Sequence, residues 1–283
     1  MNPIHVIGDY RAQLGETPVW CERSHSLLWV DIVAGKLLRY WPKDATRIEV
    51  RDMPDFTSAV LLTEDAGRFL VVSQTGIALY DYESSRFTPL CDWPEARDTR
   101  PNEAAIAPDG ALWFSSMDVN AERQVGCWYR LAGPHARPQK LLTAQWVPNT
   151  LIWWQDEIWF ADSLNGCFYR AAYASGSLNI QQRYLVGGTP DGSSLTRDGW
   201  LINARWGDAK LVYCDLGHAS PEETGALALP VRQPSNCTFG GDTLNDLYIT
   251  SARDGLRQPQ AIDGALLKIT TTMTGQPARR FRL

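Results

Sequence analysis

The stretch Leu28–Ile32, which reads LWVDI, is the first of six similar segments. Each segment is a short run of β-branched or aromatic residues that ends near Asp, Ser or Arg, and a second apolar run follows it. The other five are Phe69–Gln74 (FLVVSQ), Leu112–Met117 (LWFSSM), Ile158–Ser163 (IWFADS), Trp200–Arg205 (WLINAR) and Leu247–Ala252 (LYITSA). Consecutive segments start 41 to 47 residues apart, a spacing typical of β-propeller blades. The repeat therefore predicts an all-β protein, a six-bladed β-propeller of four-stranded antiparallel blades.

The first repeat shows the four strands that one blade needs. An inner strand begins near Glu16 in ETPVWCE, LWVDI and LLRYW follow, and the charged RIEVRDM suits an outer edge. A glycine precedes many of the third strands, where we expect a hairpin turn with positive φ: Gly35, Gly76, Gly126, Gly166 and Gly264. We expect the N-terminal IHVIGDY to complete the last blade, with the C-terminal ARRFRL as the alternative closing strand.

Composition limits the class of protein. The repeat covers nearly all 283 residues without a linker, so we expect a single domain over residues 1–283. The net charge of −5 and the lack of a basic stretch argue against a nucleic-acid partner. The N-terminus does not read as a signal peptide and no apolar run approaches 18 residues, so we expect a cytoplasmic protein with no membrane partner. Monomer and dimer both remain open.

The six cysteines are scattered along the repeats, without a CxxC motif. We interpret them as buried thiols, although their even number leaves disulfides open. The four histidines (His5, His25, His135 and His218) accompany no nucleophile motif, which argues against a Ser–His–Asp esterase.

Polar residues recur at one phase of the repeat, roughly 9 to 12 residues before each segment. They are Glu16, Thr57, Ser58, Arg100, Asn102, Asn149, Asp191, Ser235 and Asn236. The heads of the inner strands ring one end of a propeller channel, so these side chains are expected to share a small volume. Two carboxylates there would repel each other unless a cation lay between them, and all-oxygen ligands suit a divalent metal. A hydrated polar channel is the alternative.

These residues lie in motifs that resemble the SMP-30/gluconolactonase/luciferin-regenerating-enzyme family. The motifs are LGETPVW from Leu14, RPNEAAIAPDGALWFSSMD from Arg100, VPNTLIW from Val147, FADS from Phe160, TPDG from Thr189 and PSNCTFGGDTLNDLYITSA from Pro234. The resemblance spans nearly the whole chain in order. It implies a six-bladed propeller with one central divalent metal ion, and an enzyme that opens lactones of sugar acids.

Carried over by position, the resemblance implies metal ligands at Glu16, Asn149 and Asp191. It implies substrate contacts at Arg100 and Asn102, with Glu103 beside them in place of a more usual Asp. Thr17 stands where glycine is usual, a change we expect to matter little. Asp118 and Glu122 are weaker candidates, and the metal is Ca, Zn, Mn, Mg or Fe(II).

The implied chemistry is ester hydrolysis. A divalent ion polarises the lactone carbonyl and lowers the pKa of water, and Asp191 is the candidate general base. Arg100 and Asn102 would bind the sugar hydroxyls of a small-molecule lactone. Two alternatives stay open: hydrolysis of other esters or phosphotriesters on the same scaffold, and a non-catalytic calcium-binding or interaction propeller. Rim loops at Asp118–Gly126 and Asp254–Gly264 would determine which substrate binds. Arg205 and Arg253 would either meet an anionic group or be solvated or paired with carboxylates.

Overall fold

The structure, a computed structural model, describes residues 2–217 and 220–283, so His218, one of the four histidines that accompany no nucleophile motif, lies outside the described residues. The described chain forms six four-stranded antiparallel sheets, which confirms the predicted six-bladed β-propeller fold class. The chain divides into two compact units: unit 1 comprises Met1–Met53 and Gly187–Ala278, and unit 2 comprises Pro54–Val186 and Arg279–Leu283. A single domain over the whole chain stays a prediction.

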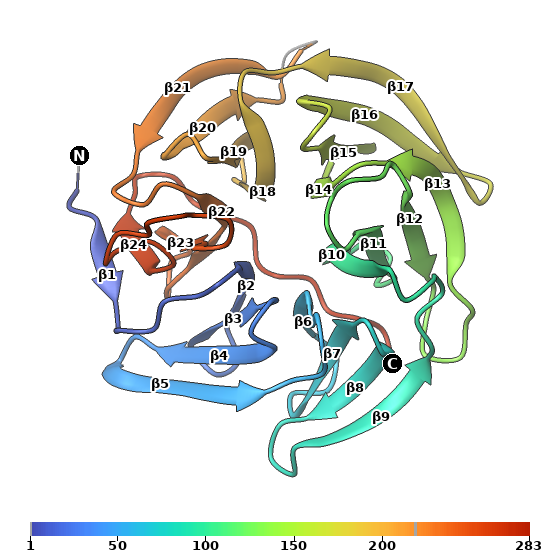
Figure 1. Cartoon of the computed structure of the whole chain (residues 1–283), viewed down its shortest axis with the longest axis horizontal. Coiled ribbons are helices and arrows are strands. Elements are labelled where there is room, and N and C mark those ends of the chain that lie inside the picture. The colour runs from blue at the N-terminus through green and yellow to red at the C-terminus, as the bar shows by residue number, and fades with distance from the viewer. Residues whose placement is uncertain (1, 218–219) are drawn as a thin grey trace. The chain divides into compact units, whose positions relative to one another are not determined.

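Unit 1 contains three sheets, each named from its inner strand to its outer strand. They are β2 (Gly15–Cys21), β3 (Ser26–Asp31), β4 (Lys36–Trp41) and β5 (Asp44–Asp52); β18 (Thr189–Leu195), β19 (Trp200–Trp206), β20 (Lys210–Asp215) and β21 (Glu222–Ala228); and β22 (Pro234–Gly240), β23 (Asp246–Ser251), β24 (Leu266–Thr270) and β1 (His5–Ile7). The inner strand β22 contacts both other inner strands, β2 and β18, as Figure 1 shows.

Unit 2 contains the other three sheets, in the same inner-to-outer order. They are β6 (Ala59–Leu62), β7 (Arg68–Ser73), β8 (Gly76–Asp81) and β9 (Arg86–Cys91); β10 (Thr99–Ile106), β11 (Leu112–Asp118), β12 (Gly126–Leu131) and β13 (Gln139–Gln145); and β14 (Pro148–Trp154), β15 (Glu157–Asp162), β16 (Cys167–Ala174) and β17 (Ser177–Leu185). The inner strand β10 contacts both β6 and β14. Each unit therefore places three inner strands next to one another.

The N-terminal strand completes the last blade, as predicted. β1 pairs antiparallel with β24 through His5–Lys268, Val6–Leu267 and Ile7–Leu266. The alternative closing strand, ARRFRL, does not complete this blade: its residues Arg279–Leu283 belong to unit 2, where Phe281 forms an isolated parallel bridge with Thr63. The first and last strands of the chain are thus neighbours in one sheet.

The glycines before the third strands follow the prediction with one exception. Gly35, Gly76, Gly166 and Gly264 have positive φ, whereas Gly126 does not, so the predicted turn conformation there is wrong. Gly126 lies within β12, and a Cβ on it would come within 2.6 Å of the Ser116 carbonyl oxygen and 2.8 Å of the Gln145 carbonyl oxygen. The residue is required there because two backbones approach it closely.

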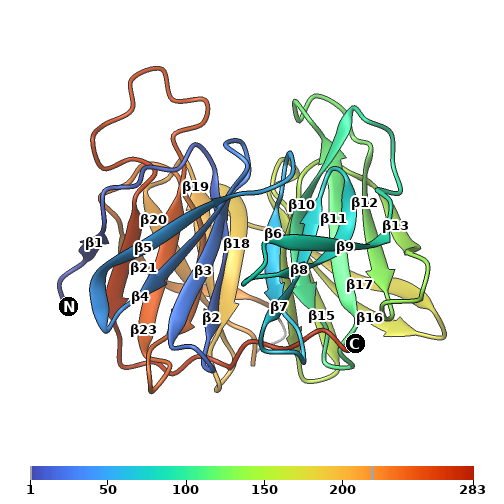
Figure 2. The ribbon, with the colours of Figure 1, turned by 90° about the horizontal axis from the view of Figure 1, so that it is seen from below.

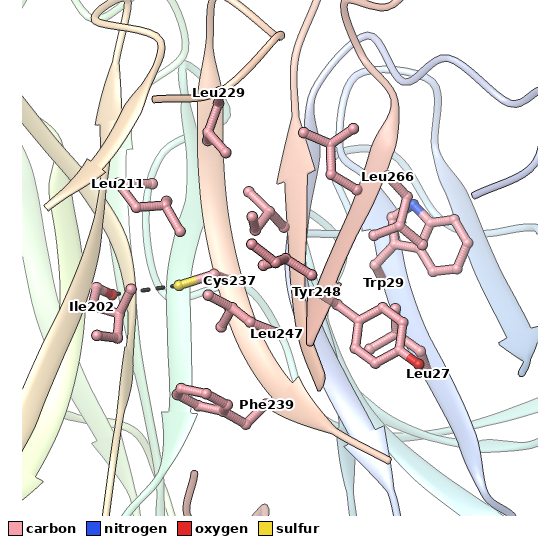
Figure 3. Close-up of a cluster of buried hydrophobic side chains, with 14 of the residues drawn as sticks. Leu27, Trp29, Ile202, Leu211, Leu229, Cys237, Phe239, Leu247, Tyr248 and Leu266 are labelled. Carbon is pink, nitrogen blue, oxygen red and sulfur yellow. Dashed lines mark hydrogen bonds between the residues drawn. The ribbon is translucent and has the colours of Figure 1, made fainter. Parts of the chain in front are cut away.

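Flat aromatic and aliphatic side chains fill the space between neighbouring sheets within each unit. In unit 1, Trp20 stacks on Tyr248 at a ring separation of 6.0 Å, and Leu27, Trp29 and Leu266 belong to the same buried cluster (Figure 3). Burying a large apolar side chain contributes about 1.5–3 kcal/mol, so such clusters hold each sheet against the next.

In unit 2, Trp128 contacts Phe160 edge-on at 5.7 Å in the equivalent layer. This layer lies between the sheets that carry β10 and β14, and it therefore fixes how their inner strands are placed.

All six cysteines lie in the described chain and none of them forms a disulfide; five are buried and Cys91 is partly exposed. Cys237 hydrogen-bonds the Ile202 carbonyl oxygen at 3.4 Å (Figure 3), and burial raises the pKa of its thiol to about 12. The five buried cysteines are packing residues. Within the described residues, no helix is long and apolar enough to cross a membrane.

Candidate functional site

Glu16 and Asp191 start two inner strands of unit 1, and Asn236 lies on the inner strand between them. All three side chains are buried. Glu16 Oε2 accepts hydrogen bonds of 2.9 Å from the Thr17 N–H and from Asn236 Nδ2. The prediction that polar side chains at the starts of the inner strands meet is therefore correct for Glu16 and Asn236.

Asp191 lies at a break in the β18–β19 pairing, so contacts with neighbouring residues hold its backbone in place of regular strand pairing. Gly192 packs so closely on Asn236 that a Cβ on the glycine would lie 2.0 Å from Asn236 Cγ. From the adjacent strand, Asn203 Nδ2 donates to the Asp191 carbonyl oxygen at 2.8 Å and to Ser193 Oγ at 2.9 Å. The backbone that carries the Asp191 carboxylate is thus fixed from both sides.

Four residues of unit 2 form one chain of hydrogen bonds. Arg100 Nη1 donates to Asn102 Oδ1 at 2.9 Å, and Asn102 Nδ2 donates to Asn149 Oδ1 at 3.1 Å. Asn149 Nδ2 in turn donates to Ser163 Oγ at 2.9 Å. Because its Nδ2 is committed to Ser163, the Asn149 amide presents its oxygen on the side of Asn102.

Glu103 is buried next to this chain of hydrogen bonds and is held by contacts on its own strand and the next. Its carboxylate accepts from the Ala104 N–H at 2.9 Å, and its own N–H donates to Ser115 Oγ at 2.9 Å. Thr57, another head in unit 2, donates to the Pro54 carbonyl oxygen at 2.7 Å and so closes its own turn. Thr57 therefore has a structural role.

β-Bulges interrupt the ladders where these heads lie. Register shifts occur between Glu16 and Val19, Pro101 and Ala104, Asn149 and Leu151, Pro190 and Ser193, and Pro234 and Asn236. A bulge re-aims a side chain out of the regular alternation. In five of the six inner strands, the polar residues near the start of the strand therefore lie at or next to a β-bulge.

Two of these bulges contain a threonine in the left-handed region. Thr17, which follows Glu16, has φ of 44°, and Thr150, which follows Asn149, has φ of 42°. A β-branched residue is strained in this conformation, which favours glycine. The substitution of glycine by Thr17 therefore does carry a conformational cost, contrary to our expectation that it matters little.

The aspartates that end the second strands have a structural role. Asp31 accepts from the N–H groups of Gln13 and Leu14 at 2.8 and 3.0 Å, and Asp162 accepts from Trp146 and Val147 at 3.0 and 3.1 Å. Each carboxylate thereby fixes the loop that leads into its inner strand. Asp31 and Asp162 therefore hold the loops before the inner strands and are not themselves part of the candidate site.

Asp118 and Arg205 are also explained by local pairing. Asp118 accepts from the Glu122 N–H at 3.0 Å and from Arg123 Nε at 2.7 Å, and these contacts hold its pKa below the ordinary value although burial opposes them. Arg205 is fully buried and pairs with Glu223 at 2.5 Å. Of the two roles considered for Arg205, the structure supports pairing with a carboxylate.

The loop between β23 and β24 projects from unit 1 (Figure 2). Its base lies beside the start of β2, because Leu14 bridges Ala252 and the Gln13 carbonyl accepts from the Arg253 and Asp254 N–H groups at 2.9 Å. Arg232 holds the far side of the loop through Asp263. This predicted rim loop therefore adjoins the strand that carries Glu16.

In the described chain, no group of three or more His, Cys, Asp and Glu side chains is arranged to hold a metal ion. The predicted ligand set consists of two carboxylates and one amide, which is a different composition. Glu16 and Asp191 lie in unit 1 and Asn149 lies in unit 2, so their joint role stays a prediction.

A family model, described as the SMP-30/gluconolactonase/LRE-like region, matches residues 14–253. The chain belongs to this family. The match begins at the motif that contains Glu16 and ends just beyond the last repeated segment. It therefore includes every polar residue predicted at the start of an inner strand.

Two curated relatives and one solved structure are similar to this chain over most of its length. The chain is 32% identical to an L-arabinolactonase of Azospirillum brasilense, covering 99% of this chain and 98% of that protein. It is 29% identical to a 6-deoxy-6-sulfogluconolactonase of Pseudomonas putida, with 89% and 88% covered. A crystal structure of regucalcin from Agrobacterium tumefaciens, described as a calcium-binding protein, has the same fold, with a TM-score of 0.90, 23% identity, and 100% and 98% coverage.

Some residues that hold the polar side chains at the starts of the inner strands in place were not predicted from the sequence. Ser163 and Asn203 occur inside the repeated second-strand segments, and Ser163 also ends the FADS motif, but neither side chain was given a role. Their polarity was a usable signal: Asn203 is a fully buried amide in an otherwise apolar strand, and such a residue needs hydrogen-bond partners.

Proposed function

We propose that the protein is a lactonase that hydrolyses lactones of sugar acids with one divalent metal ion. The observation that carries this proposal is the placement of Glu16 and Asp191 on two inner strands that both contact β22, each strand packed or hydrogen-bonded to Asn236. Two buried carboxylates whose strands both contact β22 would favour a cation as partner. The family membership and the lactonase names of similar proteins agree with this activity.

The residues present fit a divalent ion. Glu16, Asp191 and Asn149 are all buried, and all three offer oxygen donors, which suit Ca, Mg and Mn and are also accepted by Zn and Fe(II). The hydrogen bonds to Glu16 from Thr17 and Asn236, and to Asn149 from Asn102, hold these oxygens in fixed orientations. We propose these three side chains as the ligands.

The chain's own residues would then divide the chemistry. A bound divalent ion supplies a Lewis acid for the lactone carbonyl. Asp191 accepts the proton of the attacking water as general base, a role for which its rigid backbone is suited. Arg100 stabilises negative charge that develops on the carbonyl oxygen. Arg100, Asn102 and Glu103 bind the hydroxyl groups of the sugar.

A lactone panel with metal removal tests the proposal. Five- and six-carbon aldonolactones would be added to the protein with a pH indicator, with and without EDTA, and spontaneous hydrolysis would be subtracted. We expect turnover that EDTA abolishes and that one of Ca, Zn, Mn, Mg or Fe(II) restores. A phosphotriester hydrolysed faster than every lactone would favour the other esterase function, and metal binding without turnover would favour a non-catalytic propeller.

The location and the partners of the protein remain predictions from the sequence. We expect a cytoplasmic enzyme of small-molecule substrates, without nucleic-acid or membrane partners.

A further inference from the structure

Asn236 lies between the two carboxylate-bearing strands of unit 1. Its Oδ1 accepts from the Cys237 N–H at 2.8 Å, and its Nδ2 donates to Glu16 Oε2 at 2.9 Å. Because the backbone N–H needs an acceptor, the amide oxygen must face Cys237 and the NH₂ group must face Glu16. The orientation of the amide is therefore determined by its surroundings.

We propose that Asn236 is a positioning residue that holds the Glu16 carboxylate for metal binding. This inference rests on the proposed function, and it adds a residue to which the family resemblance assigns no role. Glu16 Oε2 is held by two donors, the Asn236 amide and the Thr17 N–H. Two donors on one oxygen fix the rotation of the carboxylate.

The chemical type of the donor matters for this role. An amide donates a hydrogen bond but carries no charge, so it orients the carboxylate without neutralising it. An arginine or lysine in the same place would compete electrostatically with the metal ion. Asn236 therefore fixes the direction of Glu16 and leaves its negative charge to the cation.

Asn236 also couples Glu16 to the strand of Asp191. The amide group packs directly on the Cα of Gly192, where a Cβ would lie 2.0 to 2.4 Å from Asn236 atoms. The side chain is only 5% exposed, so it has little freedom to leave this position. One amide thus contacts both strands that carry the carboxylates.

The test compares Asn236→Ala and Asn236→Leu with a control, Ser251→Ala. Leucine has a similar size and no charge, but it offers no donor to Glu16. Ser251 is also buried in the same sheet, and its Oγ donates to the Ala265 carbonyl oxygen at 2.7 Å rather than to either carboxylate. Each protein would be stripped with EDTA and titrated by calorimetry with Ca²⁺ and, separately, with Mn²⁺, and melting temperatures would be recorded with and without metal.

We expect the metal dissociation constant to rise 10- to 100-fold in both Asn236 variants, a range typical for residues that orient a metal ligand. In Ser251→Ala it should stay within about twofold of wild type, although the metal-free melting temperature falls. In a Glu16→Ala background, adding Asn236→Ala should change the dissociation constant no further.

Wild-type affinity in either Asn236 variant would overturn the proposal, as would an equal loss in Ser251→Ala or no metal binding by the wild-type protein. A wild type that binds metal but opens no lactone would reject the proposed function. The positioning role would still stand in that case if the Asn236 variants lost affinity.

Discussion

Asn102 Nδ2 donates a hydrogen bond of 3.1 Å to Asn149 Oδ1, so a residue predicted to bind the sugar touches a residue predicted to bind the metal. The two roles were separate in the sequence-based prediction. Through this bond, a change at Asn102 reaches the orientation of the Asn149 amide.

We therefore expect Arg100→Ala and Asn102→Ala to differ. Arg100→Ala should lower kcat/KM about 10- to 100-fold by removing charge-assisted hydrogen bonds to substrate, with metal content unchanged. Asn102→Ala should lower kcat/KM and also weaken metal binding. Metal stoichiometry after dialysis, measured beside the kinetics, distinguishes them; equal metal retention in both would show that the Asn102–Asn149 bond does not support the ligand.

Asp191→Asn should lose most activity while keeping the metal. Asparagine retains one oxygen donor but cannot accept a proton from water, a role typically worth 10²- to 10⁴-fold in rate. Asp198→Asn is a suitable control, since Asp198 is exposed in the turn that follows the same strand. If Asp191→Asn keeps the full rate with an occupied site, Asp191 is not the general base.

Thr17→Gly and Thr150→Gly should raise the free energy of unfolding by up to about 1 kcal/mol each. Glycine removes the cost of the left-handed conformation, which is about 1–2 kcal/mol. Part of this gain is offset because glycine loses more backbone entropy on folding. Thr88→Gly, on the exposed strand β9, should instead destabilise by about 0.5–1 kcal/mol. Urea unfolding of the metal-free variants measures all three, and a loss of stability at both strained positions would contradict the prediction.

Asp263→Asn should destabilise the protein in a pH-dependent way. Burial acts to raise the pKa of Asp263, but the hydrogen bonds from the Arg232 side chain and from the Arg232 and Gln260 N–H groups outweigh it, so the pKa lies below its ordinary value. A carboxyl of this kind contributes stability above its unfolded-state pKa, about 3.9, and the contribution is lost as pH falls through the folded value.

At pH 7 we expect the variant to be about 1–2 kcal/mol less stable, since Arg232 is half-exposed and partly screened. The difference should shrink between pH 5 and pH 3 in urea titrations. A difference that stays constant over this range would show that the charge of Asp263 does not stabilise its loop.

The sequence predicts the strands and their phase well because both depend on local pattern. The segment LWVDI falls within β3 except for its last residue, and the N-terminal strand completes the last blade as expected. The spacing of the repeat also brings the Glu16 strand, β2, and the Asp191 strand, β18, each into contact with β22 in unit 1.

Bulges and long-range contacts could not be predicted in this way. A bulge adds one residue to one strand, and alternation in a short strand does not reveal it; Thr17 and Thr150 gave no local sign of their positive φ. The Asn236–Glu16 bond joins residues 220 positions apart, and Gly126 is required by two backbones rather than by a turn. Such features depend on how the sheets pack against one another, and the pattern of neighbouring residues in one sequence does not reveal this packing.

Because β1 pairs with β24, the sheets of the two units become complete at different stages of synthesis. All three sheets of unit 2 are complete once Leu185 has been made, because their strands are contiguous in the chain. The last sheet of unit 1 needs both His5–Ile7 and Leu266–Thr270. On the ribosome, the N-terminal strand must therefore wait, unpaired, for nearly the whole chain to emerge before its partner exists.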